Sequence, residues 1–149
     1  MRISAKVDYA VRALCELAAS EPGVPVKGVD LARRQSIPVR FLENILSDLR
    51  AAGIVASRRG AEGGYWLARP PEEVAIAEVI RVLEGPLANV QGVRPEDLEF
   101  EGPAKSLRDV WLATRAALRS VLDSVTLADV VAGRLPADVE QMLSRRPEA

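Results

Sequence analysis

The sequence contains no histidine and only one cysteine, Cys15. A zinc site or an iron–sulfur cluster needs several thiolate or imidazole ligands, so these absences leave almost nothing from which to build either. A single cysteine also excludes a disulfide framework within the chain. Because Cys15 shares a face of the first expected helix with Val11, we interpret it as a small buried thiol rather than a redox sensor.

Long hydrophobic runs are missing as well. No apolar stretch approaches the ~18 residues that cross a membrane, and the N-terminus lacks the shape of a signal peptide. We therefore expect a cytoplasmic protein without membrane association. The sequence also lacks any nucleophile with a defensible base beside it, so we expect no enzymatic activity.

The net charge of −1 is small, but the charge is unevenly distributed along the 149 residues. Residues 1–69 hold 11 Lys and Arg against 7 Asp and Glu, whereas residues 70–149 hold 9 against 14. A basic part joined to an acidic part is compatible with one surface that meets a phosphate backbone.

The stretch from Ile37 to Arg69 carries the most information. Pro38 suits a first helical turn, and apolar residues then recur at spacings of three and four, namely Phe41, Leu42, Ile45, Leu46 and Leu49. Gly53 is placed to end that helix. Two short strands follow around a glycine-rich turn that begins with Arg58 and Arg59. A helix followed by a hairpin with a basic tip is typical of a winged helix.

Two helices are expected before this stretch. The first covers residues 4–19, where Asp8, Arg12 and Glu16 form a row that we interpret as a solvated ladder of charges. The second covers residues 26–36, with an inner face of Val29, Leu31 and Ala32 and with Arg33 and Arg34 outward. The turn between the second and third expected helices is very short. Two helices joined in this way predict a helix-turn-helix, in which the later helix enters the major groove of DNA.

After Pro71, we expect a helix over residues 74–84, an irregular acidic segment over 85–103 and a long helix over 104–125. Shorter helices are expected over 126–133 and 136–144, and a frayed tail from Arg145. The long helix carries an apolar stripe at four-three spacing, made of Leu107, Trp111, Thr114, Leu118, Val121 and Val125. This stripe packs either on its own wing domain or on a second chain, and we favour a homodimer.

The expected fold is therefore mainly α with a small β-hairpin wing: a winged helix-turn-helix plus a long dimerisation helix. We expect a DNA-binding domain over residues 1–85. The acidic loop, the dimerisation helix and the C-terminal helices make up residues 86–149.

Three motifs resemble a known family. They are DYAVRAL at 8–14, FLENILSDLRAAGIV at 41–55 and SRRGAEGGYWLARP at 57–70. Together they closely resemble the Rrf2 family of bacterial winged-helix transcription regulators, to which IscR-like and NsrR-like proteins belong. The resemblance implies a homodimer, crossed through its long helices, that binds a palindromic operator on double-stranded DNA and usually represses transcription.

The resemblance also implies roles for single residues. Glu43 matches a glutamate that meets base edges, where a carboxylate can accept a hydrogen bond from cytosine N4, and the neighbouring Asn44 could read adenine. Arg59 matches the wing arginine that enters the minor groove, although a solvated turn is the alternative for the wing arginines. The candidate DNA contacts are Arg33, Arg34, Pro38, Arg40, Phe41, Glu43, Asn44, Arg58, Arg59, Gly60, Gly63, Gly64 and Tyr65. Pro38 and Arg40 replace small hydroxyl residues that are frequent in IscR-like proteins, so the operator need not be the one that those proteins bind.

The segment over 85–103 departs from the family. Cluster-binding members carry three cysteines there, and this chain has none in that segment. Asp8 matches an acidic cluster ligand of NsrR-like proteins, but its partners are missing. We therefore expect no metal and no cofactor. An organic ligand, a partner protein or no effector at all stay open.

A function of a different class also stays open. Some winged helices bind proteins through the same surface, and some family members are controlled by the docking of a metabolic enzyme. The acidic residues between Glu96 and Glu101 could serve such contacts, or could simply form a solvated loop.

Overall fold

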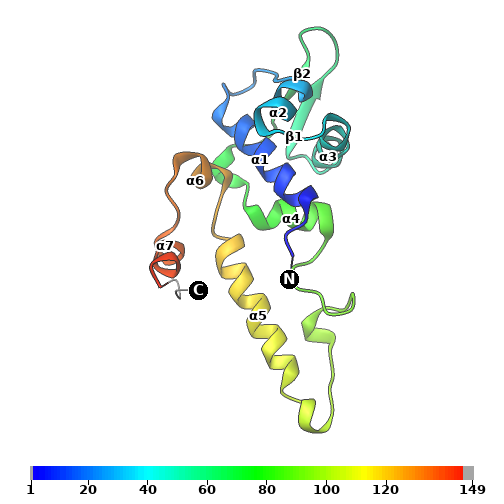
Figure 1. Ribbon diagram of the computed structural model, residues 1–149, viewed down its shortest axis with the longest axis vertical. Helices are drawn as coiled ribbons and strands as arrows, with labels where there is room; N and C mark the ends of the chain where they lie inside the picture. Colours follow the sequence, from blue (N-terminus) through cyan, green and yellow to red (C-terminus); the bar gives the residue numbers. More distant parts are fainter. Residues whose placement is uncertain (1, 146–149) are drawn as a thin grey trace.

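The computed structural model describes residues 2–145 and confirms the expected fold class (Figure 1). A body of packed helices carries a two-stranded antiparallel hairpin at one end, and one further helix extends from the other end. The helices and strands are α1 Ala5–Ala19, α2 Gly28–Gln35, α3 Val39–Ala51, β1 Val55–Arg58, β2 Gly64–Leu67, α4 Ile76–Glu84, α5 Leu107–Leu122, α6 Leu127–Ala132 and α7 Ala137–Ser144. The frayed tail that was predicted beyond Arg145 lies outside the described residues.

The boundaries of the first and third helices have local causes. Ser4 caps α1, because its Oγ accepts a hydrogen bond from the Val7 N–H at 3.2 Å. Gly53 follows α3 with φ +76°, a left-handed conformation that glycine adopts without steric cost. The two helices pack through fully buried side chains that include Leu14, Leu42 and Leu46.

The second helix is shorter than predicted. It begins at Gly28, because the backbone of Val26 pairs instead with Tyr65 of β2, with both N···O distances 2.8 Å. This extended pairing satisfies the Val26 N–H and C=O and overrides the helical pattern. Leu31 and Ala32 are buried as predicted, but the inward placement of Val29 was wrong, since this side chain is 57% exposed.

The charged row on α1 is not the solvated ladder that was predicted. Arg12 does pair with Asp8 at 3.0 Å, but its Nη1 also donates to the Gln35 carbonyl at 2.8 Å. Glu16 accepts from Gln35 Nε2 at 2.6 Å. Arg12 and Glu16 therefore bind the last residue of α2 to α1. The sequence of α1 alone does not reveal this role, because it depends on α2 lying opposite the charged row.

Cys15 is partly buried and packs against the main core. Burial, and secondarily repulsion by Glu16, raises the pKa of its thiol. A thiol held in its protonated form is a weak nucleophile, which agrees with the structural role expected for it.

After α5, the chain returns to the hydrophobic core that α1 and α3 form. The Ile76 N–H donates to the Val125 carbonyl at 2.9 Å, and the Leu127 N–H donates to the Val74 carbonyl at 3.0 Å. Leu127 is fully buried in the core formed by α1 and α3. The C-terminal part therefore completes the N-terminal core, and the division of the chain at residue 85 stays a prediction.

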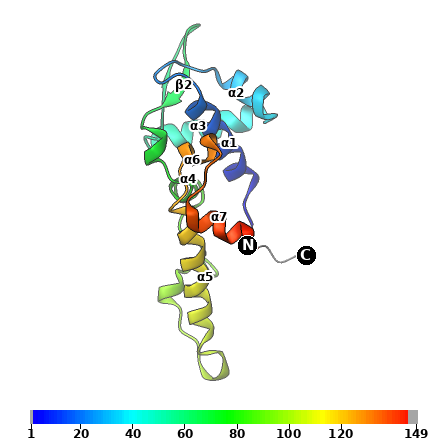
Figure 2. The same cartoon turned by 90° about the vertical axis from the view of Figure 1, so that its left-hand side faces the viewer.

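The long helix α5 and the segment 85–106, which together we call the arm, project away from the body (Figures 1 and 2). Within residues 2–145, no residue of α5 is more than partly buried. The segment is attached to α5 where Arg108 Nη2 donates to the Glu96 carbonyl at 3.0 Å and where Arg115 pairs with the Glu96 carboxylate. None of the helices in the described part of the chain is long and apolar enough to cross a membrane.

Candidate nucleic-acid interface

The outer face of α3 is polar and open to solvent. Leu42, Ile45, Leu46 and Leu49 form its buried side, so the residues between them must point outward. A stripe of different hydrogen-bonding groups at spacings of three and four results, made of Arg40, Glu43, Asn44 and Ser47. A guanidinium, a carboxylate, an amide and a hydroxyl group together can match the donors and acceptors in a major groove.

Phe41 and Pro38 lie at the beginning of α3. The Phe41 ring meets the Tyr9 ring of α1 edge-on, with the centroids 5.6 Å apart, and 39% of the residue is exposed. Pro38 is the N-cap residue of α3, directly after the turn in which Ser36 adopts φ +53°. Phe41 therefore connects α3 to α1, while part of its ring stays accessible.

Arg33 and Arg34 are both exposed near the end of α2, but each has a carboxylate beside it. Arg33 Nη2 lies 3.2 Å from Asp30, and Arg34 Nη1 lies 3.8 Å from Glu16. The structure thus does not gather these two arginines with the arginines of the wing.

The wing, residues 55–67, pairs Val55 with Leu67 at its base and Arg58 with Gly64 at its tip. Arg58 Nη2 donates to the Glu62 carbonyl at 3.4 Å across the turn, and Arg59 is exposed beside it. The glycines here have a backbone cause. A Cβ on Gly63 would lie 2.0 Å from the Arg58 carbonyl oxygen, and one on Gly64 would lie 2.6 Å from the Val26 carbonyl.

The wing and the end of α3 enclose a basic groove of 370 Å³. Its lining includes Arg58, Arg59, Gly60, Gly63, Gly64 and Tyr65, which were all predicted as DNA contacts. It also includes four residues that sequence reasoning missed, Lys27, Gly28, Arg50 and Ser57. Arg50 Nη1 donates to Ser57 Oγ at 3.1 Å and so connects α3 to the wing. Arg50 could have been found, because it lies seven residues after Glu43 on the same helix face.

The groove is chemically suited to a polyanion. Four cationic side chains border it, and no carboxylate does among the described residues. It also lies beside the N-terminus of α2, whose cap residue Lys27 makes no side-chain cap, and helix N-termini favour anions.

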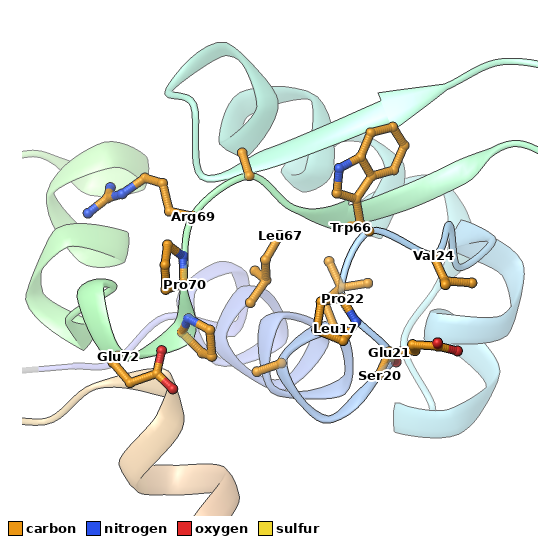
Figure 3. A pocket seen from close by; sticks show the side chains of 14 residues that line it. Leu17, Ser20, Glu21, Pro22, Val24, Trp66, Leu67, Arg69, Pro70 and Glu72 are labelled. Carbon is orange, nitrogen blue, oxygen red and sulfur yellow. The ribbon is translucent and has the colours of Figure 1, made fainter.

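A second, larger hollow of 610 Å³ lies behind the wing (Figure 3). Its walls are mainly apolar, with Leu17, Pro22 and Leu67 among them, and Glu21 and Glu72 lie at its edge. Carboxylates repel phosphate, so this side of the wing is not part of the candidate interface.

Known proteins resemble this chain over most of its length. Residues 3–133 match the family model Rrf2, described as an iron-dependent transcriptional regulator. The chain belongs to the Rrf2 family. It is 52% identical over 142 residues to Rv1287 of Mycobacterium tuberculosis, named as an HTH-type transcriptional regulator, with 95% of this chain and 88% of that protein covered.

Solved structures of Rrf2 relatives share its fold. The structure of CymR, the global cysteine regulator of Bacillus subtilis, has a TM-score of 0.75 and 39% identity, over 89% of this chain and 97% of that one. The structure of IscR from T. potens has a TM-score of 0.72 and 34% identity, over 100% of this chain and 94% of that one. These likenesses confirm the resemblance drawn from the three motifs and identify the chain as a DNA-binding transcription regulator.

The residues of this Rrf2 member do not fit an iron site. Among residues 2–145, no three His, Cys, Asp or Glu side chains lie close enough together to hold a metal ion. The sole cysteine lies on α1, partly buried against the core. Iron–sulfur clusters need several thiolates, so this chain lacks the donor set that the family description implies.

Proposed function

We propose that the protein is a homodimeric repressor that binds a palindromic operator through α3 and the wing, without an iron–sulfur cluster. The observation that carries this proposal is the polar outer face of α3 beside the carboxylate-free basic groove. The elements that carry these two surfaces, α3 and the wing, lie at the same end of the molecule, opposite the arm (Figure 1).

In this proposal, α3 reads the sequence. Glu43 accepts from the exocyclic amine of cytosine, and Asn44 pairs with the edge of adenine. Arg40, one turn earlier on the same face, contacts guanine or phosphate. Because Glu43 and Asn44 are exposed and lie on a helix whose other side is fully packed, they enter a groove without rearrangement of the backbone.

The wing and the basic groove supply affinity that is largely independent of sequence. Arg59 enters the minor groove, where negative potential attracts a guanidinium group. Lys27, Arg50 and Arg58 border the groove and contact phosphates. The hydrogen bond from Arg50 to Ser57 connects α3 to the strand of the wing that carries Arg58.

The arm supplies the dimer contact. Apolar side chains of α5 stay open to solvent in the single chain, with Leu107 at 38% and Val110 at 52% exposed. At four-three spacing, Thr114, Ala117 and Val121 continue the same stripe as Val110. A second copy of the chain that covers this stripe would hold the α3 helices of the two chains at a fixed distance from each other. The two half-sites of a palindrome require such a fixed distance.

Two of the residues expected in that interface are partly or wholly covered within their own chain. Val125 is 6% exposed within its own chain, so its side chain is already covered. Leu118 borders a hollow that Val7 and Ile80 of the same chain also line. The proposed interface is therefore centred on Val110 and Ala117 rather than on Leu118.

The test is a fluorescence-anisotropy titration of the metal-free protein with DNA from its own upstream region, over a series of salt concentrations. We expect saturation at one dimer per palindrome. With ~6 phosphates contacted, the logarithm of the binding constant should fall with the logarithm of salt at a slope of about −5. Binding no tighter than to random DNA would reject the proposed sequence reading. A reporter assay with and without the protein then decides between repression and activation.

A further inference from the structure

Three arginines from three different elements converge on one cavity. The cavity measures 380 Å³ and is lined by Arg81 of α4, Arg94 of the segment 85–106 and Arg115 of α5. Gly85, Pro86 and Leu87 complete the lining. We call this cavity the arginine pocket. It lies where the arm joins the body, far along the chain from the basic groove.

The carboxylates near the arginine pocket are shared among arginines. Asp123 lies 2.8 Å from Arg81, but it is shared with Arg119 at 3.0 Å. Glu96 pairs with Arg115 and also lies 3.9 Å from Arg94. Each of these two carboxylates thus serves two guanidinium groups, so neither is reserved for one pocket arginine.

Arg94 has one further carboxylate near it. Its Nε lies 3.8 Å from Asp97, beyond hydrogen-bond distance, and the Asp97 side chain is largely exposed. Solvent screens such a pair strongly. Arg94 therefore lines the pocket with two carboxylates at the outer limit of ion-pair distance and neither within hydrogen-bond distance.

One buried donor beside the pocket is left without an acceptor. The side chain of Arg115 is only 18% exposed, and its buried Nε finds no hydrogen-bond partner among the described residues. A buried donor without a partner is costly, so a further acceptor at the accessible part of the Arg115 guanidinium would offset part of that cost. The Glu96 carboxylate meets the other side of the same guanidinium, at Nη1.

We infer that the arginine pocket binds a small organic anion that carries a carboxylate or phosphate group. Guanidinium groups present paired N–H donors that match both kinds of group. Leu87 and Pro86 offer an apolar surface for a short carbon skeleton, and a cavity of this volume is large enough for a small metabolite.

The position of the arginine pocket allows a bound anion to regulate DNA binding. This part of the inference rests on the proposed function. An occupant would connect α4, which packs against α3 in the body, with α5 and the segment of the arm. A ligand that favours one arrangement of arm and body shifts the spacing of the two reading helices in a dimer. The anion is therefore the effector of DNA binding.

Calorimetric titration of the full chain tests the binding site. Malonate and inorganic phosphate are the two probes, at constant ionic strength, and they distinguish a carboxylate site from a phosphate site. We expect one anion per chain, and we expect Arg94→Gln and Arg115→Gln each to weaken it about tenfold. Arg134→Gln is the matched control, because it removes the same charge from an exposed residue away from the pocket and should leave the affinity unchanged.

Three results would overturn the site. They are an unchanged affinity in both pocket variants, an equal loss in the Arg134→Gln control, and a loss in Lys27→Gln instead, which would place the anion in the basic groove. Arg94 is 58% exposed, so its variant should fold even if Arg115→Gln does not, and thermal unfolding of each variant checks this.

Anisotropy titrations with and without the better probe then test the regulatory effect. We expect a severalfold change in DNA affinity that disappears in Arg94→Gln. An anion that binds in calorimetry without changing DNA affinity would overturn the regulatory effect alone. A protein that binds no DNA at all would overturn the proposed function, while calorimetry would still decide the pocket.

Discussion

The body and the arm differ in how completely each buries its apolar residues. In the body, α1, α3 and α6 share side chains that are fully buried, such as Leu14, Leu46 and Leu127. In the arm, α5 is the longest helix of the described chain and has no buried residue. The body is therefore complete within one chain, whereas the arm leaves an apolar stripe exposed, which the proposed dimer would cover. Substitutions in the body should therefore change the stability of the single chain, and substitutions on the exposed stripe of the arm should change association between chains.

The largest effect is expected in the body. Leu46→Ala removes a fully buried side chain from the centre of the core and should lower the free energy of unfolding by about 2–5 kcal/mol. Denaturant unfolding measures this loss. Leu112→Ala, on the arm, is the matched control and should cost much less, because Leu112 is only half-buried. Equal losses would break the contrast between the two regions.

The second prediction concerns assembly. Val110→Asp places a charge in the proposed interface and should weaken the dimer at least 100-fold, since burying an unpaired carboxylate is costly. Sedimentation measures the association, and circular dichroism should show that the helices of the body are intact. Ala116→Asp on the same helix, away from the stripe, should leave the dimer in place. A dimer that survives Val110→Asp would place the interface elsewhere.

The third prediction separates two functions within the body. Glu43→Ala should cost about 1–3 kcal/mol on the cognate operator and relax the preference at one base pair. Arg59→Ala should weaken binding to cognate and random DNA alike, because it acts on the backbone and groove shape. Anisotropy titrations with both DNAs measure the difference. If both variants lose affinity equally on both DNAs, the assigned roles are incorrect.

The smallest effect is expected at the junction of body and arm. Burial opposes ionisation of Asp123, but hydrogen bonds from Arg119 and Arg81 outweigh it and lower its pKa below the ordinary 3.8. The resulting stabilisation is present above the ordinary pKa and is lost as the pH falls through the lowered value. Asp123→Asn should therefore reduce stability at neutral pH by less than about 1 kcal/mol. Below the lowered pKa, the difference from the parent should vanish, as pH-dependent unfolding would show.

Several features could be predicted from local pattern because their causes are local. Gly53 ends α3, Thr126 and Asp129 form a capping box at α6, and Gly133 follows α6 with φ +68°. Each depends only on residues within one helical turn. The hairpin was predictable for the same reason, since its strands are separated by a short turn rich in glycine.

The errors came from contacts between distant segments. Val26 was expected in a helix, but Tyr65 lies beside it and takes its backbone hydrogen bonds. Arg12 and Glu16 were expected in solvent, but Gln35 lies opposite them. Lys27 and Arg50 were not recognised as neighbours of the wing, because they come from two other elements that meet there only in the folded chain.

The sequence by itself determined the helices, the wing, the family and the polar face of α3. The spacing of apolar residues, the helix-capping residues and the family motifs are all local features that can be recognised within short stretches of the chain. The tertiary structure alone decided which cations share the basic groove, where Leu127 is buried and that Arg81, Arg94 and Arg115 meet at one cavity. These arrangements join residues far apart in sequence, and packing of apolar faces, rather than local propensity, brings such residues together.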